Sequence, residues 1–332
     1  MTLAELTSRV RAEGRITADV ALEARRIVYA GDAVLTRGEA EDLLRLDEAV
    51  EDRAPEWTAL LLEAFCDHVV RQQQPPGYVD EAGADWLISA LSRDGRIKTD
   101  SELEILVRVL EIADSAPQRL VTFALEQVKR AVVDGQGPLM RGGSLERGRV
   151  SKGEVELLRR ILYAGGGDSN IGVTRAEAEI LFDINDASRG ADNDPSWTDL
   201  FSRALAASVM AASGYTPPSR DEAMRRQLWL EAPSGGVGDL LSRTFSSLLA
   251  PRRGFATLSD IPPSRMQPYV MQERELDAEP VTQDEAEWLM SRIMRDGKVD
   301  AAERELIAFL RREAPDIHPA LAPLLEAADA TA

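Results

Sequence analysis

Apolar residues recur every three or four positions along most of the chain, which is the spacing of one face of an α-helix. In ELEILVRVLEIA, for example, Leu103, Leu106 and Leu110 fall on one side of a helix. The strict alternation of apolar and polar positions that is typical of strands is rare. The pattern therefore predicts an all-α protein.

Four landmarks of the first half return in the same order in the second half. EARRIVYAGD is matched by LLRRILYAGG, LTRGEAEDLLRLDEA by VTRAEAEILFDINDA, PEWTALLLEAF by PSWTDLFSRAL, and ADWLISALSRDG by AEWLMSRIMRDG. The interval from Trp57 to Trp86 is 29 positions, whereas the interval from Trp197 to Trp288 is 91. We therefore expect two duplicated multi-helix bundles, of which the second carries about 62 extra residues.

The expected domains are residues 1–134 and 146–332, joined by a glycine-rich linker at 135–145. The extra residues of the second domain form an insert at about 214–280, which holds 8 of the chain's 17 prolines. Proline ends helices and removes a backbone donor, so we expect the insert to be rich in loops.

A short motif recurs at the expected helix starts, in which Thr, Ser or Asp stands three positions before Glu. The first residues of these motifs are Thr36, Thr99, Ser151, Thr174, Thr282 and Asp300. This is the spacing of a capping box, in which the first side chain accepts from a free amide of the first turn and the Glu accepts from the cap amide. Each box should stabilise its helix by about 1 kcal/mol.

Two of these stretches, SRDGRIKTDSELEIL and MRDGKVDAAERELI, are also similar to the second half of a calcium-binding loop. A calcium loop of the EF-hand type needs oxygen ligands at its positions 1, 3, 5 and 12. With Gly297 at position 6, Arg292 and Met294 fall on positions 1 and 3, where neither can serve as a ligand. The second stretch alone therefore does not predict an EF-hand site.

Two other forms of metal site remain open. The segment 166–177 offers Asp168, Asn170 and Glu177 at ligand positions of a calcium loop, but glycine stands at the first position. A composite site could instead combine the acidic helix starts with acidic groups of a neighbouring helix. The carboxylates available for it are Asp94, Asp100, Glu102, Asp296, Asp300 and Glu303. The competing interpretation is that these groups only cap helices and complement the helix dipole.

The junctions SRDGRIKTDSELEIL and MRDGKVDAAERELI resemble the signature helix junction of the tellurite-resistance TerB-like superfamily. The resemblance covers most of residues 10–130 and 146–320 and leaves the insert unaccounted for. It implies an all-helical, non-enzymatic module associated with stress response, metal-linked membrane complexes or regulation. It also implies that acidic residues of the junction meet divalent ions. By position, these residues would be Asp94, Glu102, Asp296 and Glu303.

The formal charge of −18 disfavours nucleic acid and anionic membrane surfaces as partners. It suits a cationic partner or a divalent cation, which is the only cofactor that the sequence suggests. No apolar run approaches the roughly 20 residues of a membrane span. The charged N-terminus, MTLAELTSRVRAEGR, lacks the apolar core of a signal peptide, so we expect a cytoplasmic protein.

Side chains that could act in catalysis are few. The only thiol is Cys66 and the only imidazoles are His68 and His318. Cys66 and His68 stand two positions apart on an expected helix, so they point to different faces, with Cys66 toward the core. We therefore expect a protein that is not an enzyme, and a site built from carboxylates and a metal is the one route to catalysis that remains.

The insert contains the segment GDLLSRTFSSLLAPRR, at 238–253, whose pattern predicts an amphipathic helix. From 232 to 272 the net charge is +2, inside an acidic protein. Such a segment could bind the groove of a protein partner, make peripheral contact with a membrane or fold back on the acidic helices. The candidate partner-binding residues are Leu240, Leu241, Phe245, Leu248, Leu249, Arg252 and Arg253.

These observations favour a cytoplasmic interaction or adaptor protein of TerB-like type, active in stress response or regulation, with the insert as its partner-binding element. The alternative is a regulator that binds a divalent cation through the acidic helix starts. The first function predicts a complex that is lost when residues 232–272 are deleted. The second predicts that an ion stabilises the fold.

Overall fold

The computed structural model describes residues 2–30, 34–74, 76–92, 94–135, 147–165, 173–212, 283–295, 297–313 and 319–324. Within these ranges the chain is all-α, which confirms the predicted fold class. Two short strands, β1 (Arg15–Ile16) and β2 (Asp52–Arg53), pair in parallel between helices. None of the described helices combines the length and the apolarity that a membrane span needs.

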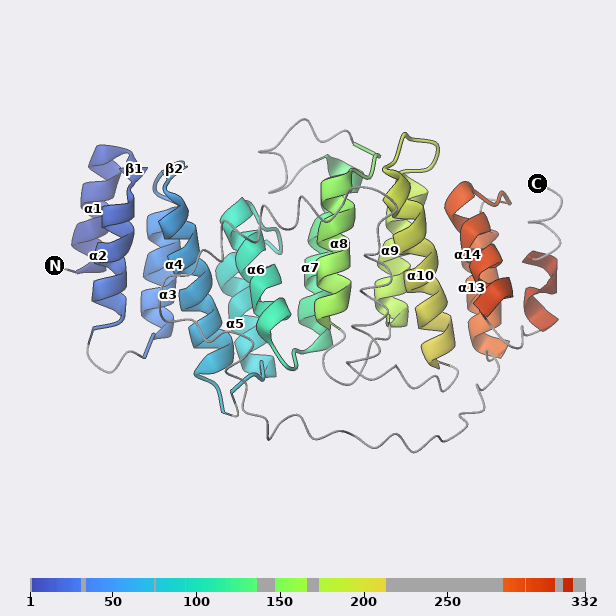
Figure 1. Cartoon of the computed structure of the whole chain (residues 1–332), viewed down its shortest axis with the longest axis horizontal. Coiled ribbons are helices and arrows are strands. Elements are labelled where there is room, and N and C mark those ends of the chain that lie inside the picture. Colours follow the sequence, from blue (N-terminus) through green and yellow to red (C-terminus); the bar gives the residue numbers. More distant parts are fainter. Residues whose placement is uncertain are drawn as a thin grey trace. The chain divides into compact units, whose positions relative to one another are not determined.

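The helices follow one another along the chain as pairs (Figure 1). The first pairs are α1 (Leu3–Glu13) with α2 (Ala18–Val28), α3 (Arg37–Asp47) with α4 (Pro55–Cys66), and α5 (Glu81–Leu91) with α6 (Asp100–Ile112). The later pairs are α7 (Gln118–Asp134) with α8 (Lys152–Gly165), α9 (Arg175–Ala187) with α10 (Pro195–Ala212), and α13 (Gln283–Ile293) with α14 (Ala301–Glu313). A π-helical turn, η1 (Asp67–Arg71), continues α4, and a 3-10 turn, η5 (Pro319–Leu321), follows α14.

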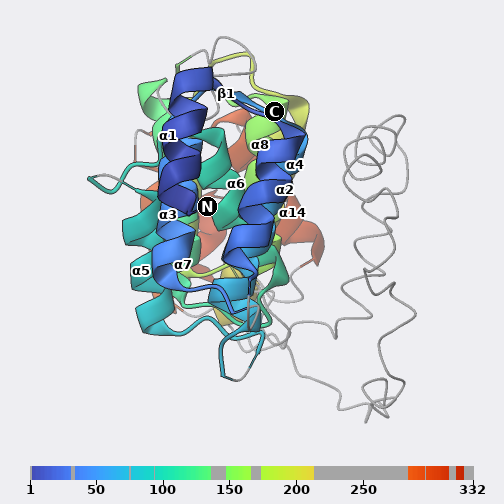
Figure 2. The same cartoon turned by 90° about the vertical axis from the view of Figure 1, so that its left-hand side faces the viewer.

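The described helices belong to one compact unit and are arranged in two layers (Figure 2). In one layer α1 contacts α3, α5 contacts α7, and α7 contacts α9. In the other layer α2, α4, α6, α8, α10 and α14 each contact the next. Most helices thus pack on neighbouring pairs, as in proteins that are built from helical repeats.

A hydrophobic cluster runs through these helices, from Leu3 in α1 to Leu324 after η5. Trp57 and Trp197 are among its largest fully enclosed side chains. Burying a large apolar side chain contributes about 1.5 to 3 kcal/mol. The shared cluster is therefore the main source of stability for the stack.

Helices on the two sides of the predicted linker pack against each other, with contacts between α7 and α8, α6 and α8, and α7 and α9. Arg160 of α8 reaches α6, where its Nη2 lies 2.9 Å from Glu104 Oε1 and its Nε lies 2.6 Å from Glu111 Oε1. Most of the predicted linker lies outside the described residues. The division into two domains stays a prediction.

Predicted capping boxes are confirmed at the starts of α3, α6, α8, α9 and α14. Thr36, Thr99 and Thr174 each accept from the amide of the Glu three positions later, and that Glu accepts from the cap amide. Ser151 and Asp300 make the same two hydrogen bonds at α8 and α14. The motif at Thr282 begins outside the described residues.

Two side-chain hydrogen bonds recur at equivalent positions of the matched landmarks. The first joins a buried indole to the helix that comes just before it in the chain. Trp57 Nε1 donates to Asp47 Oδ1 at 2.8 Å, and Trp197 Nε1 donates to Asn185 Oδ1 at 3.2 Å. The two bonds join equivalent positions, but the acceptor is a carboxylate in the first half and an amide in the second.

The second recurring bond joins two helices that are not consecutive in the chain. Trp86 of α5 donates to Glu41 of α3 at 3.2 Å, and Trp288 of α13 donates in the same way to Glu179 of α9. In the landmark alignment Trp86 is equivalent to Trp288, and Glu41 is equivalent to Glu179. These recurrences support the duplication, which stays a prediction.

The turn at Gly77 is the first test of the fold. Gly77 has a φ of +94°, and a Cβ at this position would overlap the carboxylate of Asp114. Its carbonyl accepts from the Asp114 amide at 2.8 Å, and its own amide donates to Val70 at 3.0 Å. Gly77→Ala should therefore lower the free energy of unfolding, measured by urea denaturation, by about 1 to 3 kcal/mol.

Gly38→Ala is the control for this substitution. Gly38 lies in α3, and nothing lies within 4 Å of the added Cβ. This change should raise the free energy of unfolding by roughly 0.5 to 1 kcal/mol, because glycine in a helix carries an entropic cost. Equal stability of the two variants would contradict the strained turn.

Candidate functional site at the start of α14

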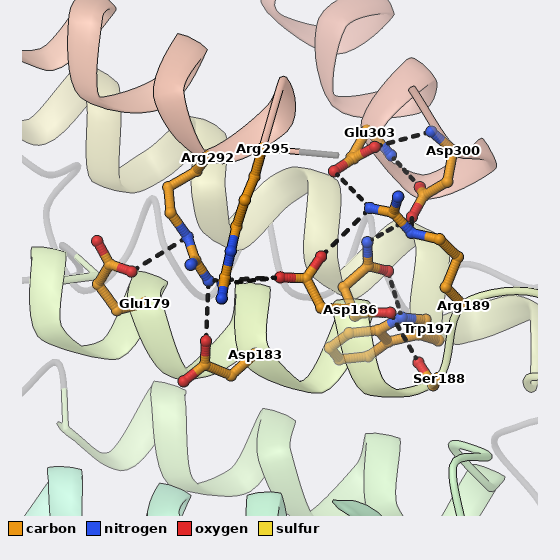
Figure 3. Close-up of polar contacts among 11 residues, drawn as sticks. Glu179, Asp183, Asp186, Ser188, Arg189, Trp197, Arg292, Arg295, Asp300 and Glu303 are labelled. Carbon is orange, nitrogen blue, oxygen red and sulfur yellow. Dashed lines mark hydrogen bonds and ion pairs between the residues drawn. The ribbon is translucent and has the colours of Figure 1, made fainter. Parts of the chain in front are cut away.

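The acidic start of α14 lies against α9 and the residues that follow it (Figure 3). Glu303 stands in the first turn of α14, and its side chain is 0% exposed. Its Oε2 accepts from the Asp300 amide at 2.7 Å, and Asp300 Oδ1 accepts from the Glu303 amide at 2.9 Å. The capping box thus uses one oxygen of each carboxylate. The other oxygen of each carboxylate can contact a different group.

The second oxygens of both carboxylates lie beside Arg189 (Figure 3). Arg189 Nη2 is 3.3 Å from Glu303 Oε1, and Arg189 Nε is 3.4 Å from Asp300 Oδ2. Asp186, near the end of α9, places its Oδ1 3.2 Å from Arg189 Nη2. The guanidinium therefore lies among three carboxylates and pairs with each of them.

Asn185 of α9 joins the same network. Its Nδ2 donates to Asp300 Oδ2 at 2.7 Å, while its Oδ1 accepts from Trp197 Nε1 at 3.2 Å. An amide has both a donor and an acceptor, so Asn185 satisfies the carboxylate and the indole together. The start of α14 is thereby connected to the core of α10.

A second arginine ties α13 to the same face of α9. Arg292 Nη2 lies 2.9 Å from Asp183 Oδ1, and its Nε lies 3.1 Å from Glu179 Oε2. Its guanidinium also lies 5.0 Å from the centre of the Phe182 ring, which is a cation–π distance. Ion pairs therefore join α13 to α9, and α14 to the turn that follows α9.

Burial raises the pKa of the Glu303 carboxyl from 4.5 to about 7. The Asp300 amide and the charge of Arg189 lower this pKa, whereas the carboxylates of Asp300 and Asp186 raise it. Burial also raises the pKa of Glu154, in the first turn of α8. The site thus contains a carboxyl group that changes its charge near neutral pH.

The candidate metal ligands of the first half, Asp94, Asp100 and Glu102, lie in different environments. Glu102 is buried, and its Oε2 accepts from the amides of Lys98 and Thr99, each at 2.9 Å. Asp94 is exposed and has a φ of +56°, and Asp100 is exposed as well. The structure therefore places Glu102 in a capping role and the two aspartates at the surface.

Glu177, the last position of the calcium-like segment, caps α9. It accepts from the Thr174 amide at 2.7 Å and from Gln118 Nε2 of α7 at 2.6 Å. Asp168, Asn170 and Asp296 lie outside the described residues. In the described part of the chain, no three Asp, Glu, His or Cys side chains come together in a way that could hold a metal ion. Metal binding with the remaining residues stays a prediction.

The thiol and imidazole of the first half have separate environments. Cys66 is buried, which confirms its predicted place in the core, and burial raises the pKa of its thiol to about 12. Such a thiol is a poor nucleophile. His68 Nδ1 lies 2.9 Å from the Leu35 carbonyl, and the ring packs edge-on against Trp86. His318 lies outside the described residues.

Sequence reasoning did not identify Arg189, although a partial signal exists. In the landmark alignment, Asp47 of the first half stands where the second half has Asn185. The exchange of a carboxylate for an amide between two copies indicates that the second network pairs differently. Arg189 itself lies beyond the matched stretches, which end at Ala49 and Ala187.

The candidate partner-binding residues of the insert lie outside the described residues. They are Leu240, Leu241, Phe245, Leu248, Leu249, Arg252 and Arg253. Comparisons with protein-family models, with curated proteins and with solved structures find no match to the chain. The TerB-like resemblance therefore depends on the sequence motif alone.

Proposed function

We propose that the chain is a non-enzymatic, cytoplasmic interaction protein of TerB-like type, whose insert binds a protein partner. The observation that carries this proposal is the pairing of Glu303 and Asp300 with Arg189 at the start of α14. Carboxylates that are bound in this way stabilise helix packing and leave little capacity for a substrate. The arrangement therefore favours a binding scaffold over a reaction centre.

The stacked helix pairs support the same proposal, because helical-repeat proteins use the surfaces of such stacks to bind partners. Charge is divided unevenly along the sequence. Residues 218–278 carry eight basic and eight acidic side chains, so the whole formal charge of −18 lies on the rest of the chain. A partner that bound both parts would need an apolar groove for the segment 238–253 and a basic surface for the helices.

Two variants of the segment 238–253 test the proposal. Phe245→Glu with Leu249→Glu places two charges on its apolar side, and should reduce the recovery of a partner at least about tenfold. Ser246→Glu with Ser247→Glu adds the same charge to the opposite side and should leave recovery unchanged. The measurement is affinity capture by the full chain, followed by titration of the purified partner.

The controls separate binding from folding. Both double variants should retain the circular dichroism spectrum and the thermal midpoint of the native chain. If neither variant loses the partner, the insert is not the binding element. If both lose it equally, the added charge and not the apolar side is responsible, and the proposal is wrong.

A further inference from the structure

The capping glutamates of the described helices differ in what their second carboxylate oxygen contacts. Glu177 Oε1 accepts from Gln118 Nε2 at 2.6 Å, and Glu303 Oε1 lies 3.3 Å from Arg189 Nη2. Glu154 stands in the first turn of α8. Its Oε1 is enclosed and has no hydrogen-bond partner among the described residues. The fold thus satisfies only one oxygen of this buried carboxyl group.

The enclosed oxygen makes the ionised form of Glu154 costly. The residue is 2% exposed, and its Oε2 accepts from the Ser151 amide at 2.7 Å. A carboxylate has only acceptors, so an enclosed oxygen that receives no donor carries uncompensated charge. A protonated carboxyl group has no net charge, so enclosing it costs much less. The geometry therefore favours the neutral form of Glu154 in the folded chain.

The helices packed against α8 are α6, α7 and α10, and their charged groups have other partners. Glu104 and Glu111 of α6 both pair with Arg160 of α8. Lys129 of α7 pairs with Glu126 at 2.6 Å. Further contacts on these helices and on the turns beside α8 join Glu102 to the Thr99 amide, Arg130 to the Gly95 carbonyl, Arg147 to the Val133 carbonyl, Arg149 to Asp192, Asp194 to the Ser196 amide and Asp199 to Arg203.

The pKa of Glu154 reflects the same environment. Burial raises the pKa of this carboxyl group, and the hydrogen bonds from Ser151 lower it by less than burial raises it. No charge among the described residues adds to these two effects. A carboxyl group whose pKa is raised on folding stabilises the fold at low pH, and this contribution is lost as pH rises through the raised value. Ionisation of Glu154 should therefore weaken the start of α8.

The start of α8 is also a junction of three elements. The Gly148 amide donates to the Val132 carbonyl of α7 at 2.8 Å. The Val150 amide donates to Asn193 Oδ1 at 2.8 Å, and the Val150 carbonyl accepts from the Asp194 amide at 2.9 Å. These bonds tie the entry into α8 to the end of α7 and to the turn before α10. A change in the first turn of α8 therefore acts on both neighbours.

We propose that the start of α8 is a pH-sensitive contact, in which Glu154 is protonated in the closed form and loss of its proton opens the first turn, so that water reaches the carboxylate. The opening loosens the junction with α7 and with the turn before α10. The proposal is independent of the proposed partner binding, because none of these residues belongs to the insert. It is also separate from the pairing of Glu303 with Arg189, because the enclosed oxygen of Glu154 has no partner among the described residues.

Carbon-13 NMR of the full chain tests the protonation. The glutamates are labelled at the side-chain carboxyl carbon, and the Glu154 signal is identified as the one that is missing in Glu154→Gln. We expect this signal to titrate at higher pH in the folded chain than the glutamate signals of the chain unfolded in urea. A Glu154 signal that titrates at the same pH as the signals of the unfolded chain would overturn the proposal.

Hydrogen exchange of the backbone amides tests the opening. After correction for the intrinsic pH dependence of exchange, the opening constant of amides 154–158 should rise by up to about tenfold per pH unit as Glu154 ionises. The rise should be absent in Glu154→Gln, because glutamine stays neutral and its side-chain oxygen can still accept from the Ser151 amide. Absence of the rise in the native chain would overturn the proposal, and this measurement does not need a folded variant.

Glu39→Gln is the matched control for the exchange experiment. Glu39 occupies the same position in the capping box of α3 but is more exposed than Glu154. This change should leave the pH dependence at 154–158 as in the native chain. Glu154→Gln, in turn, should leave the pH dependence at the start of α14 unchanged, which separates its effect from that of Glu303. If the rise at 154–158 persists in Glu154→Gln, or disappears equally in Glu39→Gln, the proposal is wrong.

Discussion

Replacing Arg189 by methionine should lower the free energy of unfolding by about 3 kcal/mol at pH 8 and by much less at pH 5.5. At pH 8 the Glu303 carboxylate is ionised and enclosed, and its Oε1 lies 3.3 Å from the guanidinium that the substitution removes. A buried charge without its partner is costly. At pH 5.5 the carboxyl group is protonated in the folded state, since burial raises its pKa to about 7.

The stability of the native chain should also depend on pH through the ionisation of Glu303. Because the Glu303 pKa is raised from 4.5 to about 7 on folding, the folded state binds more protons than the unfolded chain between these values. The contribution of Glu303 to stability therefore falls as pH rises from about 4.5 to about 7. Glu303→Gln should remove this contribution, while its side-chain oxygen can still accept from the Asp300 amide.

Urea unfolding of the native chain and the variants at pH 5.5, 7 and 8 measures these differences. Arg304→Met is the control, because Arg304 lies next to Glu303 in α14 and its Nη1 donates to the neutral Val299 carbonyl at 3.0 Å. It should cost less than about 1.5 kcal/mol at each pH. If Arg189→Met lost the same stability at pH 5.5 and pH 8, the pairing with Glu303 would not be the cause.

Helix starts could be predicted from the sequence because a capping box is a local device. Thr174 and Glu177 stand three positions apart, and both of their hydrogen bonds form within one helical turn. The apolar period of ELEILVRVLEIA likewise predicted α6, since side chains three and four positions apart share a face. These signals depend on neighbours in the sequence and not on the rest of the fold.

The pairing of Arg189 with Glu303 could not be predicted in this way, because 114 positions separate the two residues. The acidic motif at α14 is compatible with a bound metal ion and with an arginine from another helix. Only the packing of α14 on α10, beside the end of α9, decides that Arg189 reaches it. The exchange of Asp47 for Asn185 between the copies indicates a changed partner but not its identity.

The sequence pattern also could not predict how the helix pairs stack. An amphipathic period identifies the buried face of a helix, but it does not say which other helix covers that face. The landmarks predicted that helices repeat. They did not predict that α6 contacts α8, or that α7 contacts α9, across the glycine-rich segment.

Asp47→Ala should cost about 3 to 5 kcal/mol, whereas Asn185→Ala at the equivalent position should cost about 1 to 3 kcal/mol. The Asp47 side chain is 1% exposed, accepts from Trp57 Nε1 at 2.8 Å and lies 3.0 Å from Arg53 Nε. Because Arg53 is only 10% exposed, alanine leaves a nearly enclosed positive charge without its carboxylate. Asn185→Ala removes a neutral group instead.

Urea unfolding of both variants at pH 8 compares the two halves directly, with the exposed Asp42→Ala of α3 as a control that should change stability by less than about 1 kcal/mol. A larger loss at Asp47 follows from a division of roles between the halves: Asp47 is the carboxylate partner of the nearly enclosed Arg53, whereas Arg189 pairs with Glu303 and does not depend on Asn185. Equal losses would contradict this division. In the second half, Glu303 is the carboxylate that pairs with Arg189, and burial raises its pKa to about 7.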